Sequence, residues 1–260
     1  MSVTRRTPTS IALLATLGLA LLSLPLASLL IRAPWSSLSN DLSSAGAWTA
    51  FRLSIEVSVT ASLVSLALGA PVAWILARSR VPGRAVIRAV AILPLVLPPV
   101  VGGVALLAAL GRSGVVGRWL NAAGIQLTFT TLGAIVATTF VSIPLVILAV
   151  ESGLRSMDRR LEDAAATLGA SPGYVLRHVT LPLLRPQLAA GLVLAWARAL
   201  GEFGATITFA GNLAGRTQTL PLAVYQARET DPGAAVLIAL MLVGLSLIVL
   251  VALRDRIFPT

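Results

Sequence analysis

The chain has 260 residues, of which 57% are hydrophobic and only 12% are charged, with a mean hydropathy of +0.90. Soluble domains are about half apolar and about one quarter charged, so this composition excludes an ordinary soluble protein and predicts an integral membrane protein. The 20 basic residues are all Arg and outnumber the 10 acidic residues, and the absence of Cys excludes disulfides, thiolate chemistry and Cys-ligated metals.

The first apolar run extends from about Ser10 to Ile31 and is long enough to cross a bilayer as a helix. A cleaved signal peptide is the alternative interpretation, because small residues near Ala27 resemble a cleavage site, but the run is longer than the core of a usual signal peptide. We therefore predict an uncleaved first helix. The segment from Arg32 to Ala50 contains Pro, Gly and Trp, which predicts an outer loop with aromatic residues at the membrane interface.

Five more apolar runs follow, separated by more polar segments. They extend over about Phe51 to Ala77, Val86 to Leu110, Phe129 to Val150, Gln187 to Ala210 and Ala234 to Leu253. Six membrane-spanning helices are therefore predicted, in an all-α integral membrane protein. We expect residues 1–50 to form the first helix and its outer loop, residues 51–253 a core of five helices with a cytoplasmic loop at about 151–186, and residues 254–260 a cytoplasmic tail.

Arginine is distributed unequally between the two sets of connecting segments. If the N-terminus lies inside, 13 Arg residues fall on the cytoplasmic side and 6 on the outer side, with Arg198 within a span. Positive charge favours the cytoplasmic side, so both termini are predicted to be cytoplasmic. Because the Arg residues lie between apolar runs and not on one polar face, nucleic-acid binding is the weaker explanation of the basic charge.

The third apolar run contains five Pro and Gly residues within ten positions, namely Pro94, Pro98, Pro99, Gly102 and Gly103. Proline removes a backbone donor and clashes with the preceding turn, so this helix is predicted to bend or break. Counting from the cytoplasmic end at ~1.5 Å per residue places Pro98 and Pro99 near the middle of the bilayer. Broken helices at this depth are typical of a buried or water-filled path, while a purely structural kink remains the alternative.

The stretch from Glu162 to Pro182 is semi-polar and lies between two long apolar runs, which indicates a docking element outside the membrane. A short helix is predicted to end at Gly169, because glycine readily adopts the left-handed conformation of a helix C-terminus. Ser171 and Pro172 then predict a second helix, as its N-cap and first residue. An ordinary amphipathic surface loop is the alternative interpretation.

The fifth apolar run contains Arg198 and Glu202, which are four residues apart. This spacing places them on one helical face, where they can form an ion pair that avoids the cost of at least ~2.5 kcal/mol for each unpaired charge. Gly201 and Gly204 permit either a close helix contact or space for a passing solute. Structural pairing alone is the alternative, and it is favoured strongly for the similarly spaced Arg52 and Glu56 near the outer end of their span.

The longest outer connection extends over about Gly211 to Gly233. It contains turn-forming residues on both sides of the apolar piece Leu220 to Tyr225. This pattern predicts a short helix flanked by turns on the outer face.

The stretch from Glu162 to Pro182 also resembles a motif of known transporters. Asp163-Ala164-Ala165, then Gly169, then Val179-Thr180-Leu181-Pro182 is similar to the EAA loop of ABC importer permeases. Asp163 stands where that family usually has Glu, with Glu162 just before it, and Val179 stands where it usually has Ile. In that family the loop inserts into a groove of a cytosolic ATPase. The resemblance therefore implies that the coupling loop consists of Glu162, Asp163, Ala164, Ala165, Gly169, Ser171, Pro172, Leu181 and Pro182.

The segments 93–103, 197–205, 210–212 and 215–221 resemble the molybdate permease branch of this family, and sulfate and thiosulfate permeases share a weaker version. The resemblance extends from about Phe51 to the C-terminus. It implies a type I ABC importer permease (MetI-like) fold and a homodimer in a bacterial-type plasma (inner) membrane. It also implies two copies of a cytosolic ATPase and an extracytoplasmic protein that delivers molybdate or tungstate. As the translocation pathway or gate we expect Pro98, Pro99, Gly102, Arg198, Gly201, Glu202, Gly204 and Thr206.

No catalytic residue, metal site or bound cofactor is expected in this chain. An ordinary phosphate-binding loop needs a Lys, which the sequence lacks, so ATP and Mg²⁺ are expected on the partner ATPase. A membrane-embedded enzyme is disfavoured by the single His178, the absence of Cys and the lack of clustered intramembrane carboxylates. An ion-driven secondary transporter would need a coupling site, for which Arg198 and Glu202 are the only candidates.

Overall fold

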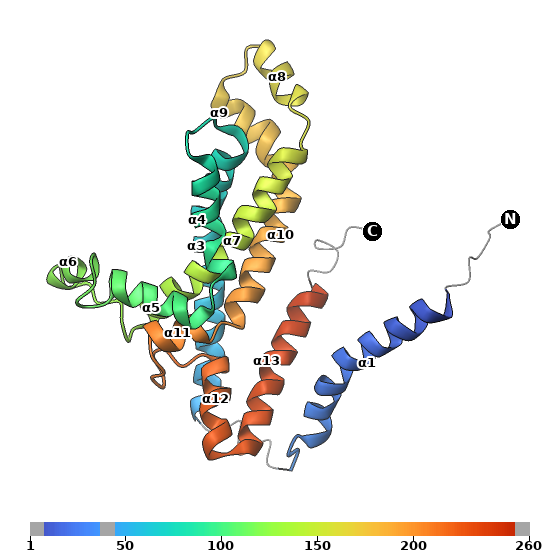
Figure 1. Ribbon diagram of the computed structural model, residues 1–260, viewed down its shortest axis with the longest axis vertical. Helices are drawn as coiled ribbons and strands as arrows, with labels where there is room; N and C mark the ends of the chain where they lie inside the picture. Colours follow the sequence, from blue (N-terminus) through green and yellow to red (C-terminus); the bar gives the residue numbers. More distant parts are fainter. Residues whose placement is uncertain (1–7, 37–44, 253–260) are drawn as a thin grey trace.

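Long helices dominate the computed structural model, which describes residues 8–36 and 45–252 (Figure 1). In chain order, the elements are α1 (Thr9–Arg32), α3 (Ala45–Arg78), α4 (Arg84–Val96), α5 (Pro99–Leu110), α6 (Gly117–Ala122), α7 (Thr131–Ser156), α8 (Arg160–Thr167), α9 (Pro172–Val175), the π-helix η1 (Leu176–Thr180), α10 (Leu181–Leu200), α11 (Gly204–Phe209), α12 (Leu220–Thr230) and α13 (Pro232–Ala252). The predicted all-α class is confirmed. The predicted tail at 254–260 lies outside the described residues.

Five helices of the described ranges are long and apolar enough to cross a membrane. Four of them are α1, α3, α7 and α13. The fifth is the continuous helical segment Pro172–Leu200, which consists of α9, η1 and α10. A sixth span is obtained when α4 and α5 are counted together, although the two helices meet at an angle of 119°. The six predicted runs therefore all correspond to helices of the protein.

The bundle centres on α3, α7 and α10, which pack along one another (Figure 1). Ala73, Leu76, Val146, Val150 and Leu184 from these three helices are almost inaccessible to solvent and form the largest apolar cluster. Between membrane-spanning helices, close van der Waals packing of such side chains holds the helices together, because lipid is as apolar as the core itself. This core gives the α8 and α9 end of the molecule a firm connection to its middle.

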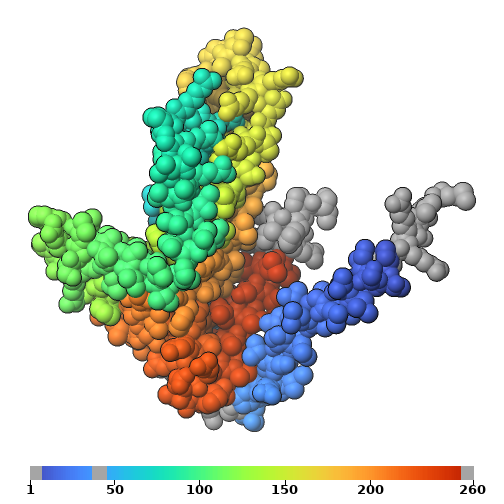
Figure 2. Space-filling model, in the orientation of Figure 1, coloured from blue at the N-terminus to red at the C-terminus, as the bar shows by residue number. Residues whose placement is uncertain are grey.

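Helix α1 stands apart from this bundle, and only its C-terminal part contacts α13 (Figure 2). None of its most apolar window is buried within the chain, although its mean hydropathy is 2.2. Leu17, Leu21 and Leu24 are each more than half exposed. An apolar helix that is exposed on all sides is suited to contact with lipid or with another membrane helix.

Two boundaries differ from the sequence prediction. The predicted outer loop was extended to Ala50, but α3 begins at Ala45, so Trp48 is helical. The predicted fifth span was continuous from Gln187 to Ala210, but α10 ends at Leu200 and α11 begins at Gly204. The expectation that Arg198 and Glu202 share one helical face is therefore wrong, because Glu202 lies in the break between the two helices.

The predicted short helix is confirmed as α12, which extends further than Tyr225, to Thr230, while its place on the outer face stays a prediction. Asp231 then caps the start of α13, because its Oδ1 atom accepts hydrogen bonds from the backbone N–H groups of Gly233 and Ala234, at 3.0 and 3.1 Å. Together α12 and α13 form a helical hairpin at the end of the molecule opposite to α8 (Figure 1).

Candidate functional site

The first broken helix lies between α4 and α5. Leu97 and Pro98 both have extended backbone, with ψ of 139° and 131°, and Pro99 is the first residue of α5. A residue that precedes proline is sterically disfavoured in the α conformation, and here Leu97 and Pro98 each precede one. The Pro-Pro pair thus stops α4, and its second member starts α5 in the position where proline is tolerated. The break that the sequence predicted is confirmed.

The second broken helix lies between α10 and α11, at Gly201, Glu202 and Phe203. The Glu202 side chain is 1% exposed, and each of its oxygens has a partner. Its Oε2 atom lies 2.6 Å from Nη1 of Arg198, and its Oε1 atom accepts a hydrogen bond of 2.7 Å from the backbone N–H of Ala205. One buried carboxylate therefore neutralises the partly exposed Arg198 and also satisfies a free donor at the start of α11. The predicted ion pair is confirmed.

The two breaks meet. Helices α5 and α11 pack side by side (Figure 1), and Gly204 lies directly against Pro99. A Cβ atom added at Gly204 would lie 2.8 Å from Pro99 Cβ and 3.2 Å from the backbone N of Val100. Only glycine permits this approach of the two backbones. We call this region, formed by Pro98, Pro99, Arg198, Gly201, Glu202 and Gly204, the break junction.

The predicted pathway residues divide into an exposed and a buried group. Pro98, Pro99 and Gly201 are exposed on this chain, and the Arg198 side chain is 28% exposed. Gly102, Glu202, Gly204 and Thr206 are buried. Gly102 lies against the Phe140 ring of α7. Thr206 Oγ1 lies 3.5 Å from Oγ1 of Thr138, which is also on α7. The exposed group faces outward from the chain, while the buried group attaches the break junction to α7.

The predicted docking element has the expected local structure. Helix α8 ends where Gly169 adopts a left-handed φ of +87°, and Ala170 N donates back to Ala165 O. Ser171 Oγ then accepts a hydrogen bond of 3.3 Å from Tyr174 N, and Pro172 is the first residue of α9. Helices α8 and α9 lie beyond the ends of α3 and α7, at one end of the molecule (Figure 1). The helix, bend and second helix that the sequence predicted are confirmed.

The outer surface of α8 carries exposed apolar side chains. Leu168 is 89% exposed and Leu161 is 50% exposed, and Asp163 is also exposed. Large apolar side chains on a short polar helix are characteristic of an interaction surface.

Glu162, also on α8, links three elements. Its Oε2 atom lies 3.1 Å from Nη2 of Arg78 at the end of α3, and its Oε1 atom accepts a hydrogen bond of 2.7 Å from Thr180 Oγ1 in η1. The resemblance placed Glu162 in the coupling loop, but its contacts with Arg78 and Thr180 were not predicted from the sequence. The structure shows that Glu162 is the carboxylate that holds α8 against the bundle.

The π-helix η1 connects α9 with α10 and has a local cause. Pro182 has no N–H to donate to the carbonyl of His178, four residues earlier, and its ring crowds that carbonyl. The helix widens at this point, and the backbone N–H of Leu181 donates to Leu176 O, five residues earlier. The side chain of Thr180, within η1, donates to Glu162, so the widened turn is also the point where α8 contacts η1, just before α10 begins.

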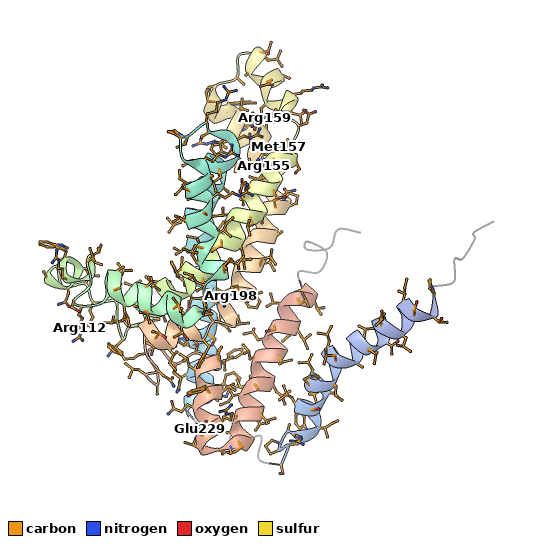
Figure 3. All side chains as sticks on the ribbon, in the orientation of Figure 1. Arg112, Arg155, Met157, Arg159, Arg198 and Glu229 are labelled. Carbon is orange, nitrogen blue, oxygen red and sulfur yellow. The ribbon has the colours of Figure 1, made fainter. Side chains whose placement is uncertain are left out.

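A second buried carboxylate, Glu151, was not predicted from the sequence. Its side chain is 2% exposed and lies between Arg155 and Arg88, at 2.7 and 3.4 Å. Arg155 and Arg159 also reach the last carbonyls of α3, those of Leu76 and Ala77, at 3.4 Å each. Figure 3 shows Arg155 and Arg159 at the α8 end and Arg198 nearer the middle of the molecule. The available signal was a Glu at the end of an apolar run followed four residues later by an Arg.

These groups form one assembly, which we call the arginine cluster. It consists of Arg78, Arg88, Arg155 and Arg159 with Glu151 and Glu162. Alternating charge ties the ends of α3, α4, α7 and α8 together. Within residues 8–36 and 45–252, no group of three or more His, Asp or Glu side chains is placed to hold a metal ion.

Comparison with known proteins gives a consistent result. Residues 69–258 match the family model described as "Binding-protein-dependent transport system inner membrane component". The chain is 45% identical over 251 residues to the molybdenum transport system permease protein ModB of Mycobacterium tuberculosis, covering 96% of this chain and 94% of the relative. It is 50% identical over 187 residues to ModB of Haemophilus influenzae, covering 72% and 81%. It is 36% identical over 238 residues to the sulfate transport system permease protein CysT of Escherichia coli, covering 90% and 86%.

Solved structures show the same fold at low sequence identity. A chain of a bacterial ABC transporter that imports alginate superposes with a TM-score of 0.75 at 18% identity, covering 95% of this chain and 93% of that chain. A chain of the MetNI methionine ABC transporter in an inward-facing conformation superposes with a TM-score of 0.61 at 18% identity, covering 82% and 93%.

Proposed function

The chain belongs to the family of binding-protein-dependent transport system inner membrane components, and from this premise we propose that it is the permease subunit of an ATP-driven molybdate importer. The observation that carries the substrate assignment is identity of 44–50% to the ModB relatives, against 34–36% to the sulfate permeases. The proposed substrates include tungstate, because tungstate is a tetrahedral dianion like molybdate. Sulfate transport is the second candidate, supported by the sulfate permease relatives.

We propose that this chain has no ATP site of its own and that hydrolysis, with ATP and Mg²⁺, takes place on a pair of partner ATPases. The surface of α8 with Leu161, Asp163 and Leu168 is the docking surface for the ATPase, because its side chains are exposed and unused by the bundle. An extracytoplasmic binding protein would deliver the anion at the opposite end, near α12. A second copy of the chain would complete the pathway on the exposed side of Pro98, Pro99 and Gly201.

The positions of charge support the orientation that this function requires. The arginine cluster, together with Arg160 and Arg177, lies at the α8 end. The α12 end has fewer Arg residues, such as Arg216 and Arg228. Positive charge favours the cytoplasmic face, so we propose that α8 is cytoplasmic and that the chain lies in the inner membrane with both termini in the cytoplasm.

One helix connects the docking element with the break junction. Helix α10 begins at the end of η1 and ends at Leu200, two residues before Glu202. Its 20 residues extend over ~30 Å at ~1.5 Å per residue. Displacement of α8 and α9 by the ATPases would therefore displace η1, α10 and Arg198 together. We propose that this displacement changes the break junction from inward-open to outward-open, and that hydrolysis resets it.

The charge of the break junction suits transport of a dianion. Arg198 is neutralised by Glu202 at 2.6 Å, so the junction has no strong net positive charge that would retain the anion. A pathway must release its solute, whereas the binding protein can supply selectivity. This arrangement fits a permease that alternates access without tight binding.

Anion uptake tests this proposal. In proteoliposomes with the ATPase, ATP and the binding protein, we expect uptake of molybdate that stops when ATP is omitted. Unlabelled tungstate should compete with it, and sulfate at the same concentration should not. Equal competition by sulfate would support the second candidate, and uptake without ATP would support an ion-driven transporter instead.

Substitution of Gly169 tests the coupling role of the docking element. The φ of +87° is unfavourable for a β-branched residue, so Gly169→Val should change the angle between α8 and α9. We expect ATP hydrolysis to continue and uptake per ATP to fall at least about fivefold, the factor that corresponds to ~1 kcal/mol. The measurement is uptake and hydrolysis in the same proteoliposomes.

Gly173→Val is the matched control for this experiment. Gly173 also has open space around it, but it lies within α9 and has no positive φ. It should retain nearly normal coupling. Normal uptake per ATP in an inserted Gly169→Val protein would contradict the coupling role of the bend.

A further inference from the structure

Helix α4 forms the first half of the broken span and leads directly to Pro98 and Pro99. It packs chiefly on α7. Among the ion pairs of residues 8–36 and 45–252, one involves α4, and it joins Nη2 of Arg88 to Oε2 of Glu151 on α7. The position of α4 relative to the docking element therefore depends on one charged contact in addition to apolar packing.

The two partners of Glu151 are unequal. Arg155 donates from Nε and Nη2 to Glu151 Oε1, at 2.9 and 2.7 Å, and both residues lie on α7. Arg88 approaches the other oxygen at 3.4 Å. The first pair is short and lies within one helix, so it stays together whatever α4 does. The second pair joins two helices and is longer, which makes it the weaker contact.

Exposure makes the second pair easy to open. The Arg88 side chain is 45% exposed, so its guanidinium can return to water at small cost. Glu151 is 2% exposed, but it retains the charge of Arg155 when Arg88 leaves. Opening would therefore leave no buried charge without a partner, unlike the removal of one member of an isolated buried pair.

Glu151 is itself fixed to the rest of the α8 end. Arg155 contacts Leu76 O at the end of α3, and Arg78 at the same end of α3 contacts Glu162 of α8. A continuous series of contacts thus runs from α8 through α3 and α7 to Arg88. This series of contacts reaches α4 in the second turn of the helix, at Arg88. Arg88 therefore lies between the docking element and the break at Pro98.

On the basis of the proposed function, we propose that Arg88 is a positioning residue for transport. Its ion pair with Glu151 holds α4 against α7 in the access state seen here and opens in the other access state. Opening of the pair releases α4 from α7 and lets Pro98 and Pro99 move, in addition to the displacement that passes through α10. Arg88 need not contact the transported anion.

A distance measurement tests this proposal independently of the substrate. The chain has no Cys, so cysteines introduced at Val86 on α4 and Ser156 on α7, both exposed, would be the only sites for spin labels. In the full chain in lipid nanodiscs, we expect Arg88→Gln to broaden or shift the distance distribution between the labels. Arg88→Lys keeps the charge and should restore most of the original distribution.

Arg84→Gln is the matched control, since Arg84 lies one turn earlier on α4 and no ion pair involves it in the part of the chain that the structure describes. It should leave the distances unchanged. Glu151→Gln, if inserted, should reproduce the effect of Arg88→Gln. The proposal is overturned if Arg88→Gln leaves the distribution at its original width and position, or if Arg84→Gln changes it equally.

Uptake per ATP provides the second readout. In the reconstituted importer we expect Arg88→Gln to keep hydrolysis and lose at least about fivefold in molybdate uptake per ATP, a factor that corresponds to ~1 kcal/mol. Arg88→Lys should recover most of it. If the unmodified importer moves no molybdate, the proposed function fails, while the distance measurement still decides the role of Arg88.

Discussion

Replacing Glu202 by Gln is expected to reduce ATP-driven uptake at least about tenfold. The amide oxygen of Gln can still accept the hydrogen bond from Ala205 N, so the start of α11 keeps its partner. The charge is lost, and Arg198 then has no anion in place of the carboxylate now 2.6 Å away. An unpaired cation at membrane depth costs at least ~2.5 kcal/mol, more than the ~1.4 kcal/mol that corresponds to a tenfold change. Uptake by membrane-inserted protein, normalised to its amount, is the measurement.

Glu56→Gln is the control for this substitution. Glu56 has an Arg four residues away, as Glu202 does, but it is exposed and no ion pair joins it to Arg52 in the described part of α3. Its uptake should stay within twofold of the original, since exposed pairs contribute about 0–1 kcal/mol. Equal uptake by the two variants would leave the Arg198 and Glu202 pair without a special role.

The double variant Arg198→Gln with Glu202→Gln separates two explanations. If the pair only compensates charge, removal of both charges should restore much of the lost uptake, because no buried ion remains. If Arg198 or Glu202 contributes to the pathway, the double variant should remain as impaired as Glu202→Gln. Either result identifies the reason for the first defect.

Local chemistry explains which features the sequence could predict. The Pro98-Pro99 pair prevents a continuous helix whatever surrounds it, and its break was predicted. The bend at Gly169 likewise depends on residues close to one another in the chain. The pairing of Arg198 with Glu202 was predicted from their spacing, although the helix that was assumed to hold them ends between them.

Contacts between distant segments explain what the sequence could not predict. Arg88 with Glu151, and Arg78 with Glu162, join residues on different helices, and no periodicity within one helix identifies such partners. Gly204, just after the break that follows Leu200, lies against Pro99, a contact that exists only in the folded chain. The most informative charged contacts of the α8 end are therefore those that the sequence pattern could not supply.

The helices that connect the two ends are expected to move as rigid bodies, with the change of conformation confined to the two helix breaks, between α4 and α5 and between α10 and α11. Helix α10 extends unbroken from η1 to Leu200, and α7 extends unbroken from Thr131 to Ser156 beside it. The backbone interruptions lie where these helices approach α5 and α11. Movement imposed at α8 should therefore concentrate at the break junction, since helices bend far less readily than the segments between them.

The contact of Gly204 with Pro99 offers the sharpest test of the break junction. Gly204→Ala adds one methyl group, whose carbon would lie 2.8 Å from Pro99 Cβ, closer than packed atoms allow. Relief requires α5 and α11 to move apart, and overpacking of this kind costs roughly 1–3 kcal/mol. We expect uptake to fall at least about tenfold, which corresponds to ~1.4 kcal/mol, while ATP hydrolysis by the assembled importer persists.

Gly201→Ala is the matched control, because it adds the same methyl group three residues away. Gly201 is exposed, and the nearest atom to an added Cβ is Ala197 O at 3.9 Å, an ordinary contact. If the fit between the two breaks governs transport, only Gly204→Ala should lose uptake. Loss in both variants would instead indicate that the break after Leu200 needs flexible backbone throughout, and uptake retained in Gly204→Ala would show that the junction tolerates separation of α5 from α11.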